Sequence, residues 1–275
     1  MKTAQDVSNS IPQTTENGGT PPRVDAPTKV RVFTIPGSHP GVAVQRMLDY
    51  KGVPYRRTDL LPVASWGVLK ALGFPGVTVP AVNIDGRKIQ GSIEIARELE
   101  SIVPEPPLFP ADPATKAVVE EAERFGDSVL QETVRRILLW SLRRDTAPLR
   151  SYLDGSRIGL PHGLGTRMAG PFIALDARSH DATDDRVQSD ISNLPGILRQ
   201  IDDWIAAGVI GGEKLNVADF QLAPSLRLAM SLDDIRPAIE DSPAGDLALR
   251  VVPDYPGRVP PVLPDAWLEP LRDSG

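Results

Sequence analysis

The sequence has 275 residues, 41% hydrophobic and 24% charged, which is typical of a globular chain long enough for two domains. The formal net charge is −6 with both signs interspersed, which excludes the broad basic surface of a nucleic-acid-binding protein. The lack of cysteine excludes disulfides, thiolate metal sites and a catalytic cysteine, and three widely spaced histidines argue against any metal site.

Residues 1–28 are polar and rich in Ser, Thr, Asn, Gly and Pro, without hydrophobic periodicity. We expect a solvated N-terminal arm. The arm lacks the apolar core of a secretory signal, and no run in the chain approaches the roughly 20 apolar residues that span a bilayer. The sequence therefore predicts a cytoplasmic protein that does not enter the membrane.

Residues 29–102 predict a small α/β domain. The expected strands are 30–35, 53–58, 79–84 and 87–90, and the expected helices are 40–51, 64–72 and 93–101. Asp85-Gly86 is a strong tight-turn dipeptide between the last two strands, and Ser92 is the expected cap of the last helix. The order β-α-β-α-β-β-α fits a small sheet with helices on its faces.

The chain changes character after this domain. Residues 103–114 are rich in proline and predict a stiff linker. Residues 115–275 then predict an all-helical domain, with helices at 115–144, 195–207 and 217–230. The weakly periodic stretch 145–194 is either a flexible cover or a segment with a further helix, at 167–190. The proline-rich tail after Asp254 is expected to follow the surface.

The last of these helices has a strong start motif. Asn216 and Asp219 are spaced so that each side chain accepts a hydrogen bond from the backbone N–H of the other residue. This capping box predicts a structural role for both residues, with no part in catalysis.

Several segments together resemble the glutathione transferase superfamily. Residues 36–40, Pro-Gly-Ser-His-Pro, are similar to the serine-type active-site turn of that family, and Val79-Pro80 to its cis-proline position. Residues 91–95, Gly-Ser-Ile-Glu-Ile, take the place of its serine-containing helix start, and 201–220 match its pattern in the helical half. The resemblance implies a thioredoxin-like α/β N-terminal domain followed by an all-α C-terminal domain.

The resemblance also implies an activity. Members of the family conjugate glutathione to small electrophiles, so we expect a homodimer with glutathione or a similar thiol as co-substrate and no tightly bound cofactor. Ser38 is the expected catalytic residue. A hydroxyl that donates to the sulfur, together with the positive end of the following helix, favours the ionised thiol. In the alternative, Ser38 is a plain helix cap. His39 either donates to the sulfur or, as we prefer, is an exposed turn residue.

The expected binding residues have alternatives as well. With a cis bond, as the resemblance implies, Val79 and Pro80 turn the backbone toward the cysteinyl part of the thiol; the alternative is a trans proline that opens a strand. Ser92 holds the γ-glutamyl carboxylate, is a plain cap, or does both. Gly91 stands where the family usually has an acidic residue or Gln, and this departure fits a different thiol or no thiol. The second functional hypothesis is therefore a non-catalytic ligand-binding or protein-interaction module of the same fold.

The long predicted helix carries further candidates. Four arginines bracket its end: Arg135, Arg136, Arg143 and Arg144. We expect them to be solvated. In a second interpretation, one of them reaches an anionic ligand between the domains. Trp140 and Trp204 are expected to pack in the core. An acceptor site for the electrophile is expected between the start of the first helix and the 120–140 face.

Overall fold

A computed structural model describes residues 27, 29–156 and 162–272. The expected N-terminal arm, residues 1–28, therefore lies outside the described residues apart from residue 27. Among the described residues, no helix combines the length and the apolar character needed to cross a membrane.

The first half of the chain has the predicted element order. Its strands are β1 (Val30–Thr34), β2 (Arg56–Asp59), β3 (Ala81–Ile84) and β4 (Arg87–Gln90), and its helices are α1 (His39–Tyr50), α2 (Pro62–Ala71) and α3 (Ser92–Ile102). The sheet order is β2-β1-β3-β4, with β1 parallel to β2 and antiparallel to β3. This is the thioredoxin-like arrangement that the resemblance implied.

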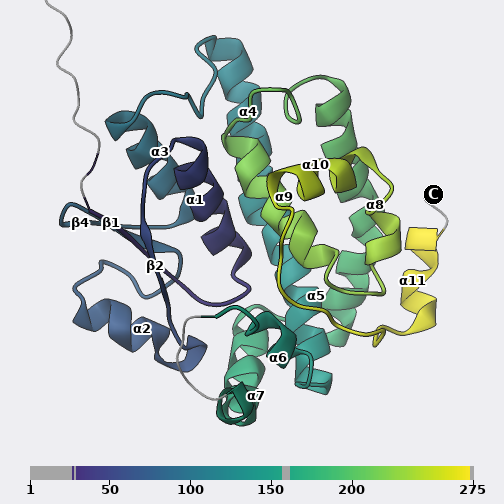
Figure 1. Cartoon of the computed structure of the whole chain (residues 1–275). Coiled ribbons are helices and arrows are strands. Elements are labelled where there is room, and N and C mark those ends of the chain that lie inside the picture. Colours follow the sequence, from purple (N-terminus) through teal and green to yellow (C-terminus); the bar gives the residue numbers. More distant parts are fainter. Residues whose placement is uncertain (1–26, 28, 157–161, 273–275) are drawn as a thin grey trace, which may run out of the picture.

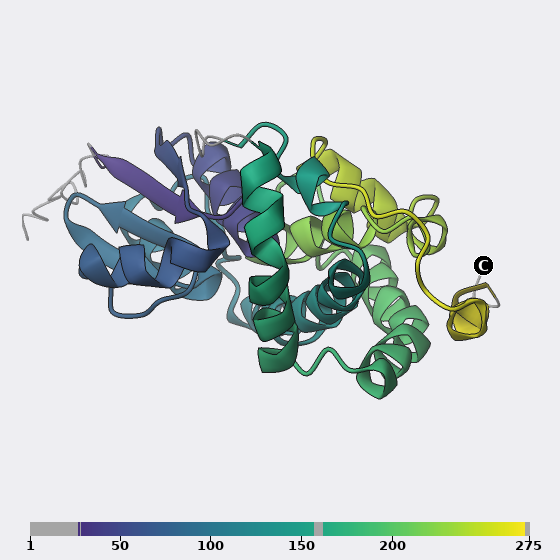
Figure 2. The same ribbon diagram turned by 90° about the horizontal axis from the view of Figure 1, so that it is seen from below.

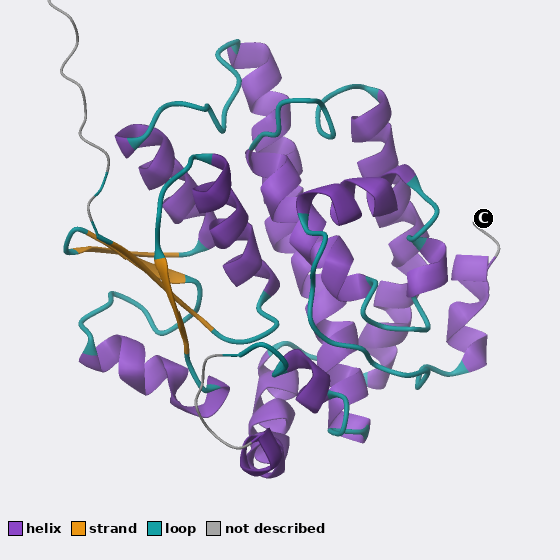
Figure 3. Ribbon diagram, viewed as in Figure 1, coloured by secondary structure: helices purple, strands orange, loops and turns teal. Residues whose placement is uncertain are grey.

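Helices cover both faces of the sheet (Figure 1; Figure 3). Because side chains alternate along a strand, Val32 joins the core under α1 and α3, whereas Phe33 points to the opposite face. There Phe33 packs with Leu69 of α2 and meets the ring of Phe74 edge-on.

The second half is helical. Its elements are α4 (Pro113–Phe125), η1 (Gly126–Leu130), α5 (Gln131–Arg144), α6 (Leu149–Tyr152), α7 (His162–Ser179), α8 (Asp184–Ala206), α9 (Val217–Ala229), η2 (Arg236–Ala238), α10 (Pro243–Val251) and α11 (Asp265–Arg272). Trp140 and Trp204 are buried in its core, as expected. The chain is therefore an α/β half followed by a helical half, as the resemblance implied.

Three helical predictions differ from the structure. The expected single helix 115–144 contains one π-helical segment, η1, between α4 and α5. The expected helix 167–190 is divided between α7 and α8, which a short turn separates. The expected start at Pro195 is wrong, because α8 begins at Asp184 and carries Pro195 within it. α7 contacts both α2 and α5, and Figure 2 shows it standing where the two halves of the chain meet.

The predicted capping box is present at the start of α9. The Asp219 carboxylate accepts a hydrogen bond from the backbone N–H of Asn216 at 2.7 Å. The side-chain Oδ1 of Asn216 accepts one from the N–H of Ala218 at 3.0 Å. Asp219 also accepts from the N–H of Gly211 at 2.6 Å. One buried carboxylate therefore joins the helix start to the turn before it.

The segment that connects the two halves is held at the C-terminal end of α1. The Lys51 side chain is fully buried, and its Nζ donates to the Glu100 carboxylate at 2.7 Å. The same ammonium donates to the carbonyl oxygens of Val103 at 2.6 Å and Pro106 at 2.9 Å. These bonds fix the segment that leads from α3 into α4.

Candidate functional site

Strand register brings the predicted site residues to one edge of the sheet. Phe33, next to the end of β1, pairs with Ala81 at the start of β3, and Ala81 pairs with Gln90 at the end of β4. The turn after β1, the residues before β3 and the residues after β4 therefore share this edge. Ser38, Val79-Pro80 and Gly91-Ser92 lie in these three segments.

Ser38 is the N-cap of α1. Its hydroxyl oxygen accepts from the N–H of Gly41 at 3.1 Å, and its side chain is buried. Its backbone N–H donates to the carbonyl of Ile35 at 3.1 Å, and its own carbonyl accepts from Val42 N–H at 2.9 Å. A hydroxyl accepts and donates at once, so capping leaves the Ser38 hydrogen available to a ligand. The two interpretations of Ser38 are compatible.

The expected exposure of His39 is wrong. His39 is only 4% exposed, because α9 packs against α1. The imidazole Nδ1 lies 2.9 Å from the hydroxyl of Ser225 on α9. Burial, and to a lesser degree the charge of Arg135, lowers the pKa of His39 well below its usual value. The ring next to Ser38 is therefore neutral at physiological pH.

The Val79–Pro80 peptide bond is cis, as the resemblance implied, and Pro80 is buried. The side chain of Gln90 braces the loop that leads into it. Its Oε1 accepts from the N–H of Gly76, and its Nε2 donates to the carbonyl of Thr78 at 2.8 Å. Both polar atoms of the Gln90 side chain are thus hydrogen-bonded to the backbone of this loop.

The start of α3 differs by one residue from the prediction. The N-cap of α3 is Gly91, which has no side chain to cap the helix. Ser92 is the first helical residue and is buried. Ser92 is therefore not the cap, because the backbone already turns helical at its own position. A Cβ at Gly91 would meet Glu94 Oε2 at 2.1 Å. The Glu94 carboxylate thus occupies the space that a side chain at position 91 would fill.

A second carboxylate, from the other half of the chain, interacts with the charge of Glu94. Asp127 of η1 is half-buried, and its Oδ1 accepts from Gln221 Nε2 at 3.2 Å. Burial raises the pKa of Asp127, Arg135 opposes the rise, and the nearby charge of Glu94 adds to it. Glu94 and Asp127 therefore form an acidic pair across the junction.

The four arginines of α5 have different surroundings. Arg136 makes a two-pronged, buried ion pair with Asp190, with Nε 2.6 Å from Oδ2. Arg144 lies over the ring of Trp140 and Arg143 is exposed. Arg135 pairs with Glu132 on its own helix and lies close enough to His39 to lower its pKa. Of these four arginines, Arg135 is therefore the one placed near the start of α1.

The C-terminal segment also reaches the turn. The hydroxyl of Tyr255 donates to the carbonyl oxygen of Gly37 at 2.6 Å. A cavity of about 90 Å³ beside Ser38 is lined by Arg46, Arg57, Asp254 and Pro256, among others. Sequence reasoning missed this contact, because nothing local relates residues 218 positions apart.

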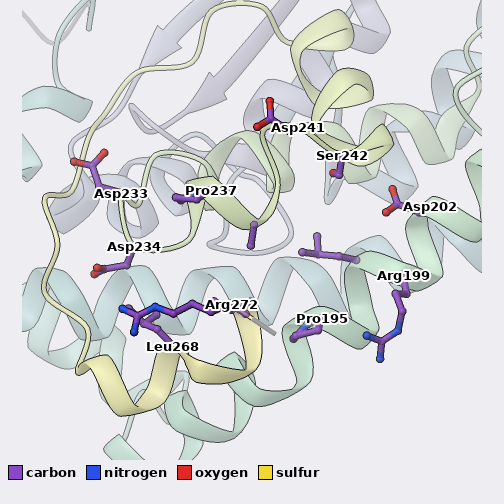
Figure 4. Close-up of a pocket in the computed structure, with 13 residues that line it drawn as sticks. Pro195, Arg199, Asp202, Asp233, Asp234, Pro237, Asp241, Ser242, Leu268 and Arg272 are labelled. Carbon is purple, nitrogen blue, oxygen red and sulfur yellow. The ribbon is translucent and has the colours of Figure 1, made fainter. Parts of the chain in front are cut away.

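A larger cavity, about 800 Å³, lies between α8, η2 and α11 (Figure 4). Two of its carboxylates accept hydrogen bonds from the backbone. Asp202 accepts from Ala244 N–H at 2.9 Å, and Asp234 accepts from the backbone of Val262 at 2.8 Å. It shares no lining residue with the cavity beside Ser38. Among the described residues there is also no His, Asp and Glu cluster suited to a metal ion.

Comparisons with known proteins agree with the fold. Residues 32–107 match the family model described as glutathione S-transferase, N-terminal domain. No curated protein matches the sequence.

The chain also resembles solved structures. A glutathione transferase from Phanerochaete chrysosporium is 17% identical with a TM-score of 0.62, over 82% of this chain and 97% of that one. A glutathione S-transferase from Rhodospirillum rubrum is 17% identical with a TM-score of 0.57, over 88% and 99%. One from Methylobacterium radiotolerans, in complex with glutathione sulfonate, is 16% identical with a TM-score of 0.55, over 86% and 97%. At these identities the likeness shows the fold.

Proposed function

We propose that the chain is a member of the glutathione transferase superfamily and conjugates a thiol to a small electrophile; its fold and the family match of residues 32–107 support this proposal. The proposed thiol is glutathione or another low-molecular-weight thiol. The observation that carries this proposal is the Ser38 hydroxyl, which caps α1 at the sheet edge shared with cis-Pro80 and Ser92.

The chemistry required is ionisation of the thiol. A free thiol has a pKa of about 8.5, so little thiolate exists at neutral pH. The Ser38 hydroxyl donates to the sulfur, and the partial positive charge of the α1 N-terminus stabilises the thiolate further. His39 contributes no charge, because burial keeps its ring neutral. The thiol proton passes to solvent. The thiolate sulfur then forms a bond to the electrophilic carbon, and the leaving group departs with the electrons of the bond that breaks.

The acidic pair offers a place for the amino group of a γ-glutamyl thiol. Gly91 supplies no side chain, but the Glu94 carboxylate lies over it and Asp127 is nearby. Two carboxylates attract an ammonium group, while the N-terminus of α3 at Ser92 attracts the carboxylate. Glu94 thus compensates for the missing acidic residue at position 91. The M. radiotolerans neighbour, solved with a glutathione derivative, supports the same choice of thiol.

We place the electrophile between the start of α1 and α5, on the side where Arg135 lies. The family resemblance further supports a homodimer, a cytoplasmic location and a role in detoxification, and these remain parts of the proposal.

Calorimetric titration with reduced glutathione tests the proposal, on the wild type, on Ser38→Ala and on Ser101→Ala as a control at an exposed serine of α3. Turnover of a generic aryl halide is measured on the same samples. We expect all three proteins to bind glutathione and Ser38→Ala alone to lose turnover.

If the wild type does not bind at millimolar glutathione, glutathione is not the substrate. Binding without turnover by the wild type would favour the non-catalytic module. One observation favours this non-catalytic function. The cavity beside Ser38 is about 90 Å³, whereas ligand pockets are commonly about 300–1,000 Å³.

A further inference from the structure

The C-terminal segment 252–259 crosses from the helical half to the turn that carries Ser38. The Tyr255 hydroxyl donates to the Gly37 carbonyl oxygen at 2.6 Å. Burial raises the pKa of Tyr255 well above its usual value, and Tyr152 adds to the rise against the opposing charge of Arg227. The hydroxyl therefore stays protonated and remains a donor.

This bond fixes one side of the peptide group that joins Gly37 to Ser38. The other side of the same group is the Ser38 N–H, which donates to the carbonyl of Ile35 at 3.1 Å. A planar peptide group held at both its carbonyl and its N–H cannot rotate freely. The direction in which the Ser38 side chain leaves the backbone is therefore set by Ile35 on one side and Tyr255 on the other.

The segment itself is anchored on both sides of Tyr255. Before it, Arg227 of α9 donates to the carbonyl oxygens of Val252 at 2.8 Å and Pro253 at 3.1 Å. After it, Val259 N–H donates to the carbonyl of Ser231 at 2.8 Å. Tyr255 is thus presented to the turn by a segment whose two ends are fixed to the helical half.

A second tyrosine packs beneath the segment. Tyr152 is buried, and a Cβ at Gly37 or Gly257 would lie 2.8 Å or 2.1 Å from its ring. Its hydroxyl bonds to that of Ser231 at 2.6 Å. Tyr152 therefore supports the same region without a hydrogen bond to the Gly37 carbonyl, which makes it a matched comparison for Tyr255.

We propose that segment 252–259 is part of the thiol site and that Tyr255 is a positioning residue, which orients the Ser38 hydroxyl toward the sulfur through the Gly37 carbonyl. This inference rests on the proposed function. Loss of the tyrosine hydroxyl frees the Gly37–Ser38 peptide group, so the serine donates to the sulfur for a smaller fraction of the time. The bound thiol then ionises at higher pH, while the γ-glutamyl contacts at α3 are untouched.

The test is a pH titration of glutathione bound to the wild type, Tyr255→Phe and Tyr152→Phe, followed by the ultraviolet absorbance of the thiolate. We expect the pKa of the bound thiol to rise by about one unit in Tyr255→Phe, which is about tenfold less thiolate at neutral pH. We expect Tyr152→Phe to keep the wild-type value. Affinity for glutathione is expected to stay within about twofold in both variants. Amide hydrogen exchange is followed in parallel and should accelerate for residues 36–42 in Tyr255→Phe only.

The outcomes separate the two proposals. If the wild type yields no thiolate signal, the proposed function fails, and this inference fails with it. If the wild type ionises the thiol and Tyr255→Phe does so at the same pH, the proposed function stands and Tyr255 is not a positioning residue. Equal shifts in both variants would also overturn the inference, because they would show a general loss of packing.

Discussion

The imidazole Nδ1 of His39 lies 2.9 Å from the hydroxyl oxygen of Ser225, 186 residues further along the chain. This contact joins the start of α1 to the middle of α9, so the residue that follows Ser38 is held by the helical half. Both side chains are buried. The position of the turn that carries Ser38 therefore depends on how the two halves pack.

Stability should fall in mild acid because of His39. Its pKa is lowered in the folded chain by burial and by Arg135, whereas the unfolded chain takes up the proton near the usual value of 6.5. Below that pH the unfolded state binds more protons, so the free energy of unfolding decreases as pH falls; above it, the contribution is constant. We expect the wild type to lose about 1 kcal/mol more than His39→Gln between about pH 7.5 and about pH 5.5, by urea denaturation. Parallel pH profiles for the two proteins would show that His39 is not buried as a neutral ring.

Glu94 should matter for binding of the thiol. Replacing its carboxylate by an amide in Glu94→Gln removes a charge-assisted bond to the amino group of glutathione, so we expect about tenfold weaker affinity by calorimetry. Glu121→Gln, on the exposed face of α4, is the control and should bind like the wild type. Equal affinities for all three proteins would remove Glu94 from the site.

Asp219 should be a larger contributor to stability than an ordinary helix cap. Its buried carboxylate accepts from two backbone N–H groups, those of Asn216 and Gly211. Asp219→Ala leaves both donors without this partner, so we expect a loss of about 2 kcal/mol or more in urea denaturation. Asp246→Ala removes an exposed acidic residue from the first turn of α10 and should cost about 0.5 kcal/mol or less. Similar losses in the two variants would contradict the double role of Asp219.

Gly257 should tolerate no side chain. Its φ of +99° favours glycine, and a Cβ would lie 2.1 Å from the ring of Tyr152. Gly208 has a φ of +70° with no atom within 4 Å of its Cβ position, so Gly208→Ala carries the backbone cost alone, about 1 kcal/mol. We expect Gly257→Ala to be less stable than Gly208→Ala by at least about 1 kcal/mol, because the ring must move. We expect thiol turnover to fall in Gly257→Ala and not in Gly208→Ala. Equal melting temperatures for the two variants would contradict the close contact between position 257 and the ring of Tyr152.

Local patterns predicted the first half of the chain. Alternating β-branched residues before Pro36-Gly37 and the Asp85-Gly86 turn depend only on neighbouring residues, so the strands and their order follow from the sequence. The Asn216 and Asp219 capping box was equally local and is present. The helix start at Ser92 was misplaced by one residue, because a glycine N-cap leaves no side-chain pattern to read.

Contacts between distant segments could not be predicted in this way. α7 carries Pro171 within a weakly periodic segment, and α8 continues through Pro195, so packing overrides the local preference at both prolines. The burial of His39 depends on α9, and the bond from Tyr255 to Gly37 depends on the path of the C-terminal segment. The turn between β1 and α1 was visible in the sequence, but the groups that surround it were not.

We propose that the sulfur of glutathione comes to residue 38, and the absence of cysteine from the sequence allows a direct measurement. Ser38→Cys introduces the sole thiol, whose thiolate attacks the disulfide of oxidised glutathione, forms a mixed disulfide and releases one glutathione thiolate. Mass spectrometry follows the adduct, with Ser101→Cys as an exposed control and hydroxyethyl disulfide as a reagent without γ-glutamyl groups. We predict that Ser38→Cys, although residue 38 is buried, reacts with oxidised glutathione at a rate that saturates with concentration and exceeds that of Ser101→Cys. We predict no saturation with hydroxyethyl disulfide. A rate that stays linear in oxidised glutathione and below that of Ser101→Cys would show that residue 38 does not face a glutathione site.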